Sequence, residues 1–260
     1  MPFTVSHAAA VLPLRKLNLI TSAFIVGSMA PDFPYIIGNT EYRGLGHQFP
    51  GVIEFTIPAS LLALWLFHSI IKRPIIGLLP ASMQERLRCQ TADFNFGGAS
   101  RFLAILASIS LGILSHLAWD SFTHAYTWPW RRFAWLRGFV HIPFVHHRLQ
   151  LFAALQYIST IAGILALAIW VVLWYRRSAP GVRVSPKSPP KSHFGLAVAM
   201  FAIAAIAGTV RAALIIGLPA SVGRADHFLL VCGVTSLATA FWQLLFYCVL
   251  VSSHQVWTIP

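Results

Sequence analysis

The sequence predicts an all-α protein built from helices that cross a membrane. Of its 260 residues, 57% are hydrophobic and only 10% are charged, whereas about 25% of the residues in an ordinary soluble domain are charged. Several apolar runs also reach the roughly 20 residues that a helix needs to cross about 30 Å of hydrocarbon. Water therefore cannot be the solvent for most of the surface, and a polytopic transmembrane helical bundle is the predicted fold class.

The apolar runs give five predicted spans and one shorter helix. The spans lie near residues 52–71, 99–119, 151–175, 194–217 and 227–251. A further apolar stretch runs from Leu17 to Ala30, but it is short and ends where Gly27, Ser28 and Pro31 interrupt it. We therefore expect a buried or re-entrant helix there. If that stretch also crossed the membrane, the number of spans would be six.

A basic segment rich in proline and serine divides the chain. Residues 176–193 contain Lys and Arg but no acid, which is typical of a flexible cytoplasmic linker. The segment separates a front membrane bundle, residues 1–175, from a C-terminal pair of transmembrane helices, residues 194–260. Because the front bundle holds most of the histidines and acids, we expect the chemistry there.

The net charge of +12 does not indicate binding to nucleic acid. The basic residues lie between apolar spans and do not form a patch with interleaved aromatic residues on a soluble face. Lys and Arg near helix ends hold loops on the cytoplasmic side and attract anionic headgroups. Membrane lipids are therefore the predicted partners, and nucleic acid is not.

The strongest local motif is His116, Asp120 and His124 at the end of the second span. On a helix, positions i, i+4 and i+8 drift by only about 40° per step, so the three side chains share one stripe. Imidazole nitrogen and carboxylate oxygen are both good ligands of Zn²⁺. Placing a carboxylate near hydrocarbon costs on the order of 3 kcal/mol of insertion free energy. Asp120 is therefore expected to have a polar partner or a functional role. The motif predicts a metal site, with hydrogen bonding between helices or an ion pair as the alternative.

Three residues of the N-terminal third are further candidate ligands. His7 lies near the start, Asp32 follows the point where the short helix breaks, and His47 precedes the first full span. Singly, each is an ordinary polar residue of a loop or helix end. Together they supply two imidazoles and a carboxylate on the side of the membrane where the His116 motif emerges. A metal-bound imidazole also needs an acceptor for its other ring nitrogen, for which Glu54 is one candidate.

Four segments within residues 1–175 carry a family resemblance: MPFTVSHAAAVLPL, GSMAPDFPY, LWLFHSIIKRPIIGLLP and LSHLAWDSFTH. They resemble a bacterial integral-membrane family with no assigned function. That family is similar in turn to membrane-bound metal-dependent hydrolases and zinc-dependent phospholipase C proteins, which share an ordered His, Asp, His, HxxxD, His pattern. The resemblance implies a helical zinc site whose ligands stand, in the same order, at His7, Asp32, His47, His116, Asp120 and His124.

The chain departs from the phospholipase pattern at later positions. Those enzymes complete a third metal with HxxxE, where this chain has His146 and Gln150. Tyr157 stands where we expect a histidine in the membrane family, and tyrosine is a rare zinc ligand. One or two zinc ions are therefore expected.

These observations lead to the hypothesis of a zinc-dependent hydrolase of the bacterial inner membrane that acts on a lipid-linked or headgroup phosphoester. In this hypothesis Asp32 is a further ligand or the general base, and the five other candidates are ligands. Two alternatives stay open. One is a transporter or channel component that uses the His and Asp residues as an ion or proton site. The other is a structural protein whose polar groups only hold helices together.

Overall fold

In the computed structural model of the chain, helices make up 85% of the described residues, which include almost no strand. The structure describes residues 4–14, 17, 19–38, 44–87, 93–141, 148–178, 193–219 and 221–257. Five helices are long and apolar enough to cross a membrane, at Val52–Leu78, Ala99–Arg132, Leu151–Arg177, Phe194–Ile216 and Gly223–Ser252. The predicted all-α class and the five spans are thus confirmed, and the chain is a multi-pass membrane protein. Most of the predicted linker, residues 179–192, lies outside the described residues.

The chain packs as two compact units that alternate along the sequence. The first, which we call the site unit, consists of Met1–Pro34, Tyr42–Leu61 and Phe96–Val171. The second, the hairpin unit, consists of Tyr35–Glu41, Leu62–Asn95 and Val172–Pro260. All six candidate ligands belong to the site unit, so the functional argument rests on that unit alone.

The site unit begins with short helices and continues with long ones. Its elements are η1 (Thr4–Ala10), α1 (Val11–Leu14), α2 (Thr21–Met29), η2 (Ala30–Asp32), α4 (Gly44–His47), η3 (Val52–Thr56), the start of α5 (Ile57–Leu66), α8 (Ala99–Thr123), α9 (Trp128–Arg132), η6 (Ala134–Arg137), β1 (Phe139–His141), β2 (Arg148–Gln150) and most of α10 (Leu151–Arg177). The two strands pair antiparallel, with Val140 opposite Leu149. The predicted short helix is α2, and it has nine residues.

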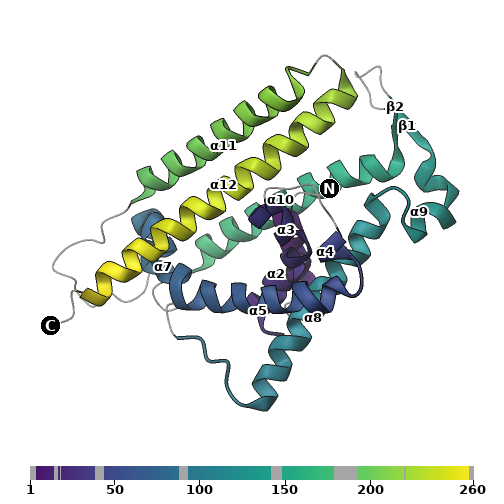
Figure 1. The fold of residues 1–260 in the computed structure, drawn as a ribbon. Helices are drawn as coiled ribbons and strands as arrows, with labels where there is room; N and C mark the ends of the chain where they lie inside the picture. Colours follow the sequence, from purple (N-terminus) through teal and green to yellow (C-terminus); the bar gives the residue numbers. More distant parts are fainter. Residues whose placement is uncertain are drawn as a thin grey trace. The chain divides into compact units, whose positions relative to one another are not determined.

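The hairpin unit holds the two C-terminal spans. Its elements are most of α3 (Phe33–Gly38), the rest of α5, η4 (Phe67–Ile71), α6 (Lys72–Leu78), α7 (Ala81–Leu87), α11 (Phe194–Ile216) and α12 (Val222–Trp257). Helices α11 and α12 lie side by side (Figure 1). Arg211 on α11 donates a hydrogen bond from Nη1 to Thr235 Oγ1 on α12 at 2.9 Å, which gives a cation within an apolar span a polar partner.

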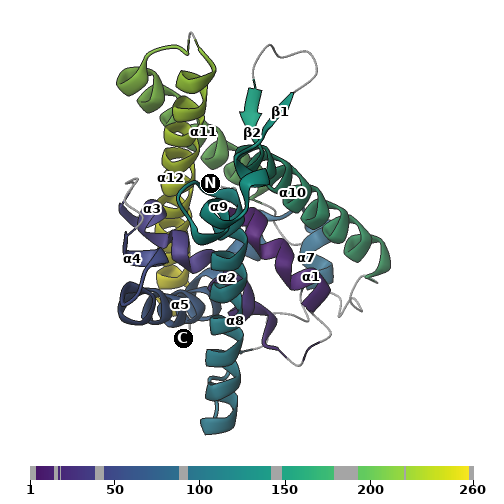
Figure 2. The ribbon, with the colours of Figure 1, turned by 90° about the vertical axis from the view of Figure 1, so that its right-hand side faces the viewer.

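The core of the site unit is the contact between α2 and α8 (Figure 2). The buried residues of α8 recur every three or four positions, from Ile105 and Ile109 through Gly112 to His116 and Asp120. This spacing puts one stripe of the helix against α2. The stripe is apolar along most of its length and becomes ionisable only near its C-terminal end.

Glycines let the backbones of α2 and α8 touch. A Cβ atom added to Gly112 would overlap the carbonyl oxygen of Phe24, and one added to Gly27 would overlap the carbonyl oxygen of Ile109. Small residues permit this kind of approach between membrane helices, where dispersion contacts rather than water provide most of the attraction. The close backbone contact therefore helps to fix the register of α8 against α2.

We expect Gly112→Ala to lower the free energy of unfolding by about 2 kcal/mol, because the added methyl group forces α2 and α8 apart. Thermal or denaturant unfolding in detergent, followed by circular dichroism, measures this change. Gly233→Ala on α12 is the matched control, since an added Cβ there meets nothing within 4 Å. Equal stability of the two variants would contradict the close contact.

Candidate metal centre

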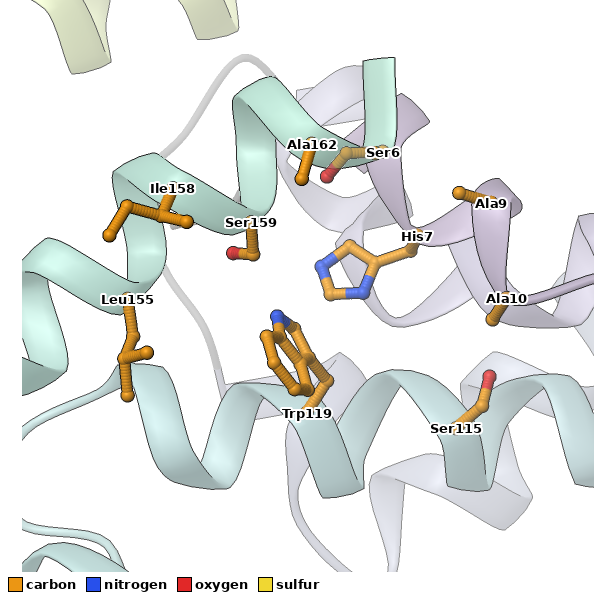
Figure 3. A pocket seen from close by; sticks show the side chains of 11 residues that line it. Ser6, His7, Ala9, Ala10, Ser115, Trp119, Leu155, Ile158, Ser159 and Ala162 are labelled. Carbon is orange, nitrogen blue, oxygen red and sulfur yellow. The ribbon is translucent and has the colours of Figure 1, made fainter. Parts of the chain in front are cut away.

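Helix α8 and the N-terminal helix η1 each bring part of the candidate site into the site unit. His116 and Asp120 are one turn apart on the buried face of α8, and His124 is the residue at which that helix ends. Because side chains three residues apart line up on a 3₁₀ helix, Thr4 and His7 share one buried face of η1. Figure 3 shows the His7 ring pointing into the space between α8 and α10.

Asp32 and His47 are brought together by a contact between two short segments. A Cβ atom added to Gly46 would overlap the carbonyl oxygen of Pro31. The residue after each of these two is a candidate ligand, Asp32 at the end of η2 and His47 at the end of α4. Asp32 and His47 are 15 positions apart in the sequence, and the contact at Gly46 brings them close together in space.

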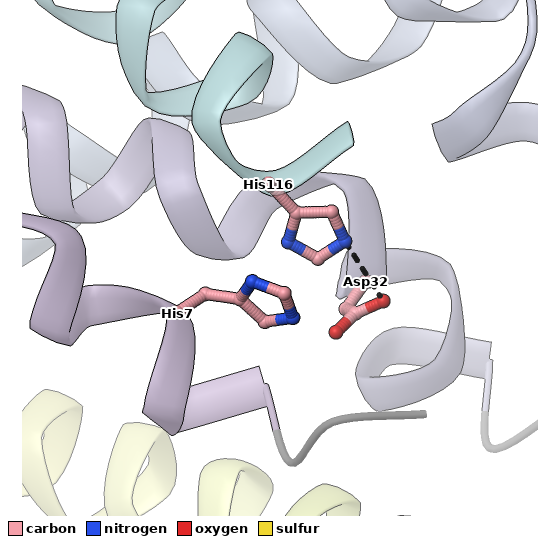
Figure 4. Close-up of side chains that lie close together, drawn as sticks. All are labelled: His7, Asp32 and His116. Carbon is pink, nitrogen blue, oxygen red and sulfur yellow. Dashed lines mark ion pairs between the residues drawn. The ribbon is translucent and has the colours of Figure 1, made fainter. Parts of the chain in front are cut away.

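The ligand atoms of four candidates form a close cluster, in which five of the six distances lie between 3.2 and 3.6 Å. His47 Nε2 lies 3.2 Å from His116 Nε2 and 3.4 Å from Asp120 Oδ2. His116 Nε2 lies 3.6 Å from Asp120 Oδ2. Asp32 Oδ1 is 3.6 Å from Nε2 of His47 and 3.6 Å from Nε2 of His116; the latter pair is drawn in Figure 4.

These distances fit the coordination polyhedron of zinc. Ligands at 2.0–2.2 Å from a tetrahedral Zn²⁺ lie about 3.3–3.6 Å from each other. Of the six edges among the four atoms, the five given above measure between 3.2 and 3.6 Å. His47, His116 and Asp120 by themselves form one set that could hold a metal ion, and His7, Asp32 and His116 form another. The donor set of imidazole and carboxylate is the kind that zinc accepts.

Neighbouring groups orient His116 and Asp32 toward this point. His116 Nδ1 lies 2.8 Å from the Ser28 carbonyl oxygen, which can only accept, so Nδ1 carries a hydrogen and the lone pair of the neutral ring is on Nε2. This is the arrangement that metal-bound histidines adopt. Thr4 Oγ1 donates to Asp32 Oδ2 at 2.7 Å, which leaves Oδ1 as the oxygen directed at the imidazoles. Glu54, the acceptor suggested from the sequence, is exposed.

His7 and His124 flank the four central residues. The His7 ring stacks on His116 with 3.9 Å between ring centroids, and His7 Nε2 lies 3.5 Å from Asp120 Oδ1. His124 Nδ1 lies 2.8 Å from the backbone oxygen of Asp120, so a metal would meet its Nε2. Neither three-residue set includes His124. The structure thus brings five candidates into one cluster, with the sixth at its edge.

Burial shifts the pKa values of His7 and Asp32, which lie outside the spans. It lowers the pKa of His7 to about 3, with the neighbouring His116 as the next cause, so His7 is a neutral ring with a free lone pair at physiological pH. Burial raises the pKa of Asp32, and the nearby Asp120 raises it further, against the opposing effect of His116. Both carboxylates are nearly inaccessible, with Asp32 0% and Asp120 4% exposed. A divalent cation between them would offset this cost of burial.

A comparison with protein families identifies the chain. The model described as "Domain of unknown function (DUF4184)" matches residues 1–253. The chain belongs to this family. The matched region includes all six candidate ligands. It also extends well past residue 175, the end of the region that carries the family resemblance in the sequence. The prediction of a family without an assigned function is confirmed. No curated protein and no solved structure matched the chain.

Sequence reasoning did not find the groups that orient the ligands. The role of Thr4 could have been predicted from the sequence, because Thr4 lies three residues before His7 and a 3₁₀ helix puts both on one face. The role of the Ser28 carbonyl could not, since every residue has a backbone oxygen. Trp119, between the two α8 ligands, lines a cavity beside His7. His146, which marks the departure from the phospholipase pattern, lies outside the described residues.

We expect Gly46→Ala to weaken zinc binding about 10- to 100-fold, as changes around metal ligands commonly do, although no ligand is altered. The added methyl group displaces His47 from Asp32 by pushing α4 away from Pro31. Competition with a fluorescent zinc chelator in detergent measures the affinity. Gly98→Ala is the matched control, because an added Cβ there meets nothing within 4 Å. Unchanged affinity in Gly46→Ala would contradict this assignment of the site.

Proposed function

We propose that this protein is a zinc-dependent membrane hydrolase that acts on a phosphoester of a lipid or of a lipid headgroup. The observation that carries the proposal is the set of five ligand-to-ligand distances between 3.2 and 3.6 Å, drawn from three separate segments of the chain. These distances match the edges of a zinc tetrahedron, and the donor set of imidazole and carboxylate is one that zinc accepts.

His47, His116 and Asp120 are the proposed zinc ligands. Catalytic zinc sites hold the ion with three protein groups and keep a fourth position for water or substrate, whereas four protein ligands close a site. Two histidines and one carboxylate are a known catalytic combination. A zinc ion in this set would act as a Lewis acid that polarises a phosphoryl oxygen and makes water more acidic.

Asp32 Oδ1 lies at the fourth corner of this set, and Asp32 is proposed as a further ligand or, where water takes that corner, as the general base. Its Oδ1 lies 3.6 Å from both imidazole nitrogens and, within the described part of the chain, makes no hydrogen bond. The bond from Thr4 fixes the other oxygen. Burial raises the pKa of Asp32, which makes the carboxylate a stronger base than an exposed one. Asp32 Oδ1 would accept the proton of the attacking water.

His7 marks the direction in which a second ion or the substrate would lie. Its neutral Nε2 points at Asp120 Oδ1, while Oδ2 of the same carboxylate faces His47 and His116. A carboxylate with its two oxygens on different partners can bridge two metal ions, and paired ions are common in phosphoester hydrolysis. The proposed content is therefore one or two zinc ions, with His124 Nε2 as a further donor at the edge.

The substrate and the location are also part of the proposal. The six candidates follow the order found in zinc-dependent phospholipase C proteins, which supports a phosphoester as the substrate. The site lies in a unit built around membrane-spanning helices, which supports a lipid as its carrier. The resemblance of residues 1–175 to bacterial sequences supports the bacterial inner membrane as the location.

A change from Asp120 to Asn separates the zinc site from a helix-packing network. Asn keeps the size and hydrogen bonding but removes the anionic oxygen, so zinc content should fall sharply. If Asp120 only bonded neighbouring groups, Asn would replace it at a cost of about 1 kcal/mol and nothing else would change. Zinc per protein, measured by mass spectrometry after purification in detergent, decides between the two.

Asp93→Asn is the matched control for that experiment. Asp93 is exposed and pairs with Arg73 at 2.9 Å, so its removal should leave zinc content unchanged. Helicity measured by circular dichroism must be equal in all three proteins. Wild-type protein that carries no stoichiometric zinc after zinc-replete purification, or an Asp120→Asn variant that keeps it all, would overturn the proposed function.

A second substitution tests the role of Asp32. As the general base, Asp32→Asn should lower the rate of hydrolysis of bis(p-nitrophenyl) phosphate at least about 100-fold while zinc stays bound to the three ligands. The measurement pairs p-nitrophenol release with zinc content in the same preparation. Loss of zinc together with activity would show instead that Asp32 is a fourth ligand.

A further inference from the structure

A cavity of about 410 Å³ adjoins the metal centre inside the site unit. Its walls come from η1, α8 and α10, with His7 and Trp119 on one side and Leu155, Ile158 and Ala162 among the residues on the other (Figure 3). Cavities of 300–1,000 Å³ are the usual size for small-molecule sites. Of the candidate ligands, only His7 lines it, so the cavity is a neighbour of the cluster and not the cluster itself.

The walls of the cavity are suited to hydrocarbon. Apart from His7, they consist of alanine, leucine, isoleucine, tryptophan, glycine and three serines. Ser115 Oγ donates to the Gly112 carbonyl at 2.7 Å, and Ser159 Oγ donates to the Gln156 carbonyl at 3.0 Å. Each of these hydroxyl hydrogens is used within its own helix. A polar ligand would lose its hydration here with few donors to replace it.

The cavity borders the apolar exterior of helix α10. Helix α10 has an apolar exterior, with Ile158 60%, Ile161 60% and Leu165 55% exposed, and a helix of this composition spans the bilayer. Ile158 of α10 lies both on this exposed surface and in the cavity wall, and Trp119 of α8, 44% exposed, also lines the cavity. A lipid chain packed beside α10 would therefore lie against the cavity wall.

The opposite end of the cavity is polar. His7 forms part of its wall, and His7 Nε2 is 3.5 Å from Asp120 Oδ1. One continuous space thus joins an apolar region beside the exterior of α10 to the edge of the proposed zinc site. An amphiphile matches that gradient, with its chain in the apolar part and its polar group at His7.

We propose that this cavity binds an alkyl chain of the lipid substrate and so directs the phosphoester at its polar end to the metal centre. The inference rests on the proposed function for the reaction, but chain binding itself needs only the cavity. This proposal implies that the natural substrate is an amphiphile with at least one long chain, rather than a water-soluble phosphoester.

The test fills the cavity without touching a proposed ligand. In Ala162→Phe the new ring occupies the chain site, and the same change at Ala168, an exposed position of α10 that does not line the cavity, is the matched control. Native mass spectrometry in detergent follows the binding of dioleoyl and dihexanoyl phosphatidylglycerol. Zinc content is measured on every sample.

We expect wild type and Ala168→Phe to bind one dioleoyl lipid saturably. Ala162→Phe should bind it at least about tenfold more weakly, the effect of excluding two methylene groups. The dihexanoyl lipid should bind weakly and equally to all three. Equal dioleoyl binding by Ala162→Phe and wild type, or equal affinity of wild type for both lipids, would overturn the proposal.

Ile158→Trp provides a second filled cavity if Ala162→Phe loses helicity, and the same weakening is expected. The two proposals fail in different ways. If the protein binds the dioleoyl lipid in the predicted pattern but holds no zinc, the proposed hydrolase function is contradicted and the proposed chain-binding cavity is supported. If the protein holds zinc but all variants bind the lipid equally, the chain-binding cavity is contradicted and the hydrolase proposal is not.

Discussion

The burial of two carboxylates in one cluster is the constraint on which the rest of the site unit depends. Asp32 and Asp120 are almost completely shielded from water, and each such group is expensive unless it is neutralised or paired. The ion-pair partners that the structure gives Asp32 are His47 and His116. His7, whose pKa burial lowers to about 3, adds a lone pair rather than positive charge beside Asp120. The arrangement is therefore suitable as a cage for a cation.

Close backbone contacts position the segments that carry these side chains, and hydrogen bonds from Thr4 and to Ser28 then orient Asp32 and His116. Gly27 and Gly112 let α2 and α8 touch, and Gly46 does the same for the segments that end in Asp32 and His47. The Ser28 carbonyl reaches His116 only because α2 lies this close to α8. A binding site must hold its ligands to within a fraction of an ångström. Here small residues at the contacts and these two hydrogen bonds provide that rigidity.

Much of the fold could be predicted from the sequence, because the membrane imposes a simple rule on length and polarity. Runs of about 20 apolar residues gave the five spans, and a shorter run gave α2. The stripe of His116 and Asp120 followed from the helical period. Which loop residues would join them was harder. His7, Asp32 and His47 were found by their chemistry and by family order, whereas the contacts at Gly46 and Gly112 depend on how distant segments pack, which no local pattern encodes.

The cavity beside His7 was not predictable for a related reason. Its walls combine alanines and a serine of η1 with a tryptophan of α8 and aliphatic residues of α10, and each of these is ordinary for an apolar helix. Only the spacing between the helices creates the opening. Composition can say that a membrane helix is apolar, but it cannot say where two such helices fail to fill the space between them.

The candidate ligands are spread from His7 to His124 along the chain, and this spread has a consequence for biosynthesis. His7, Asp32 and His47 precede all five described spans, whereas His116 and Asp120 lie on the second of them. The set is therefore complete only once that second span has been made and has packed against α2. Any metal that the set bound would be captured late in maturation rather than at the start of synthesis.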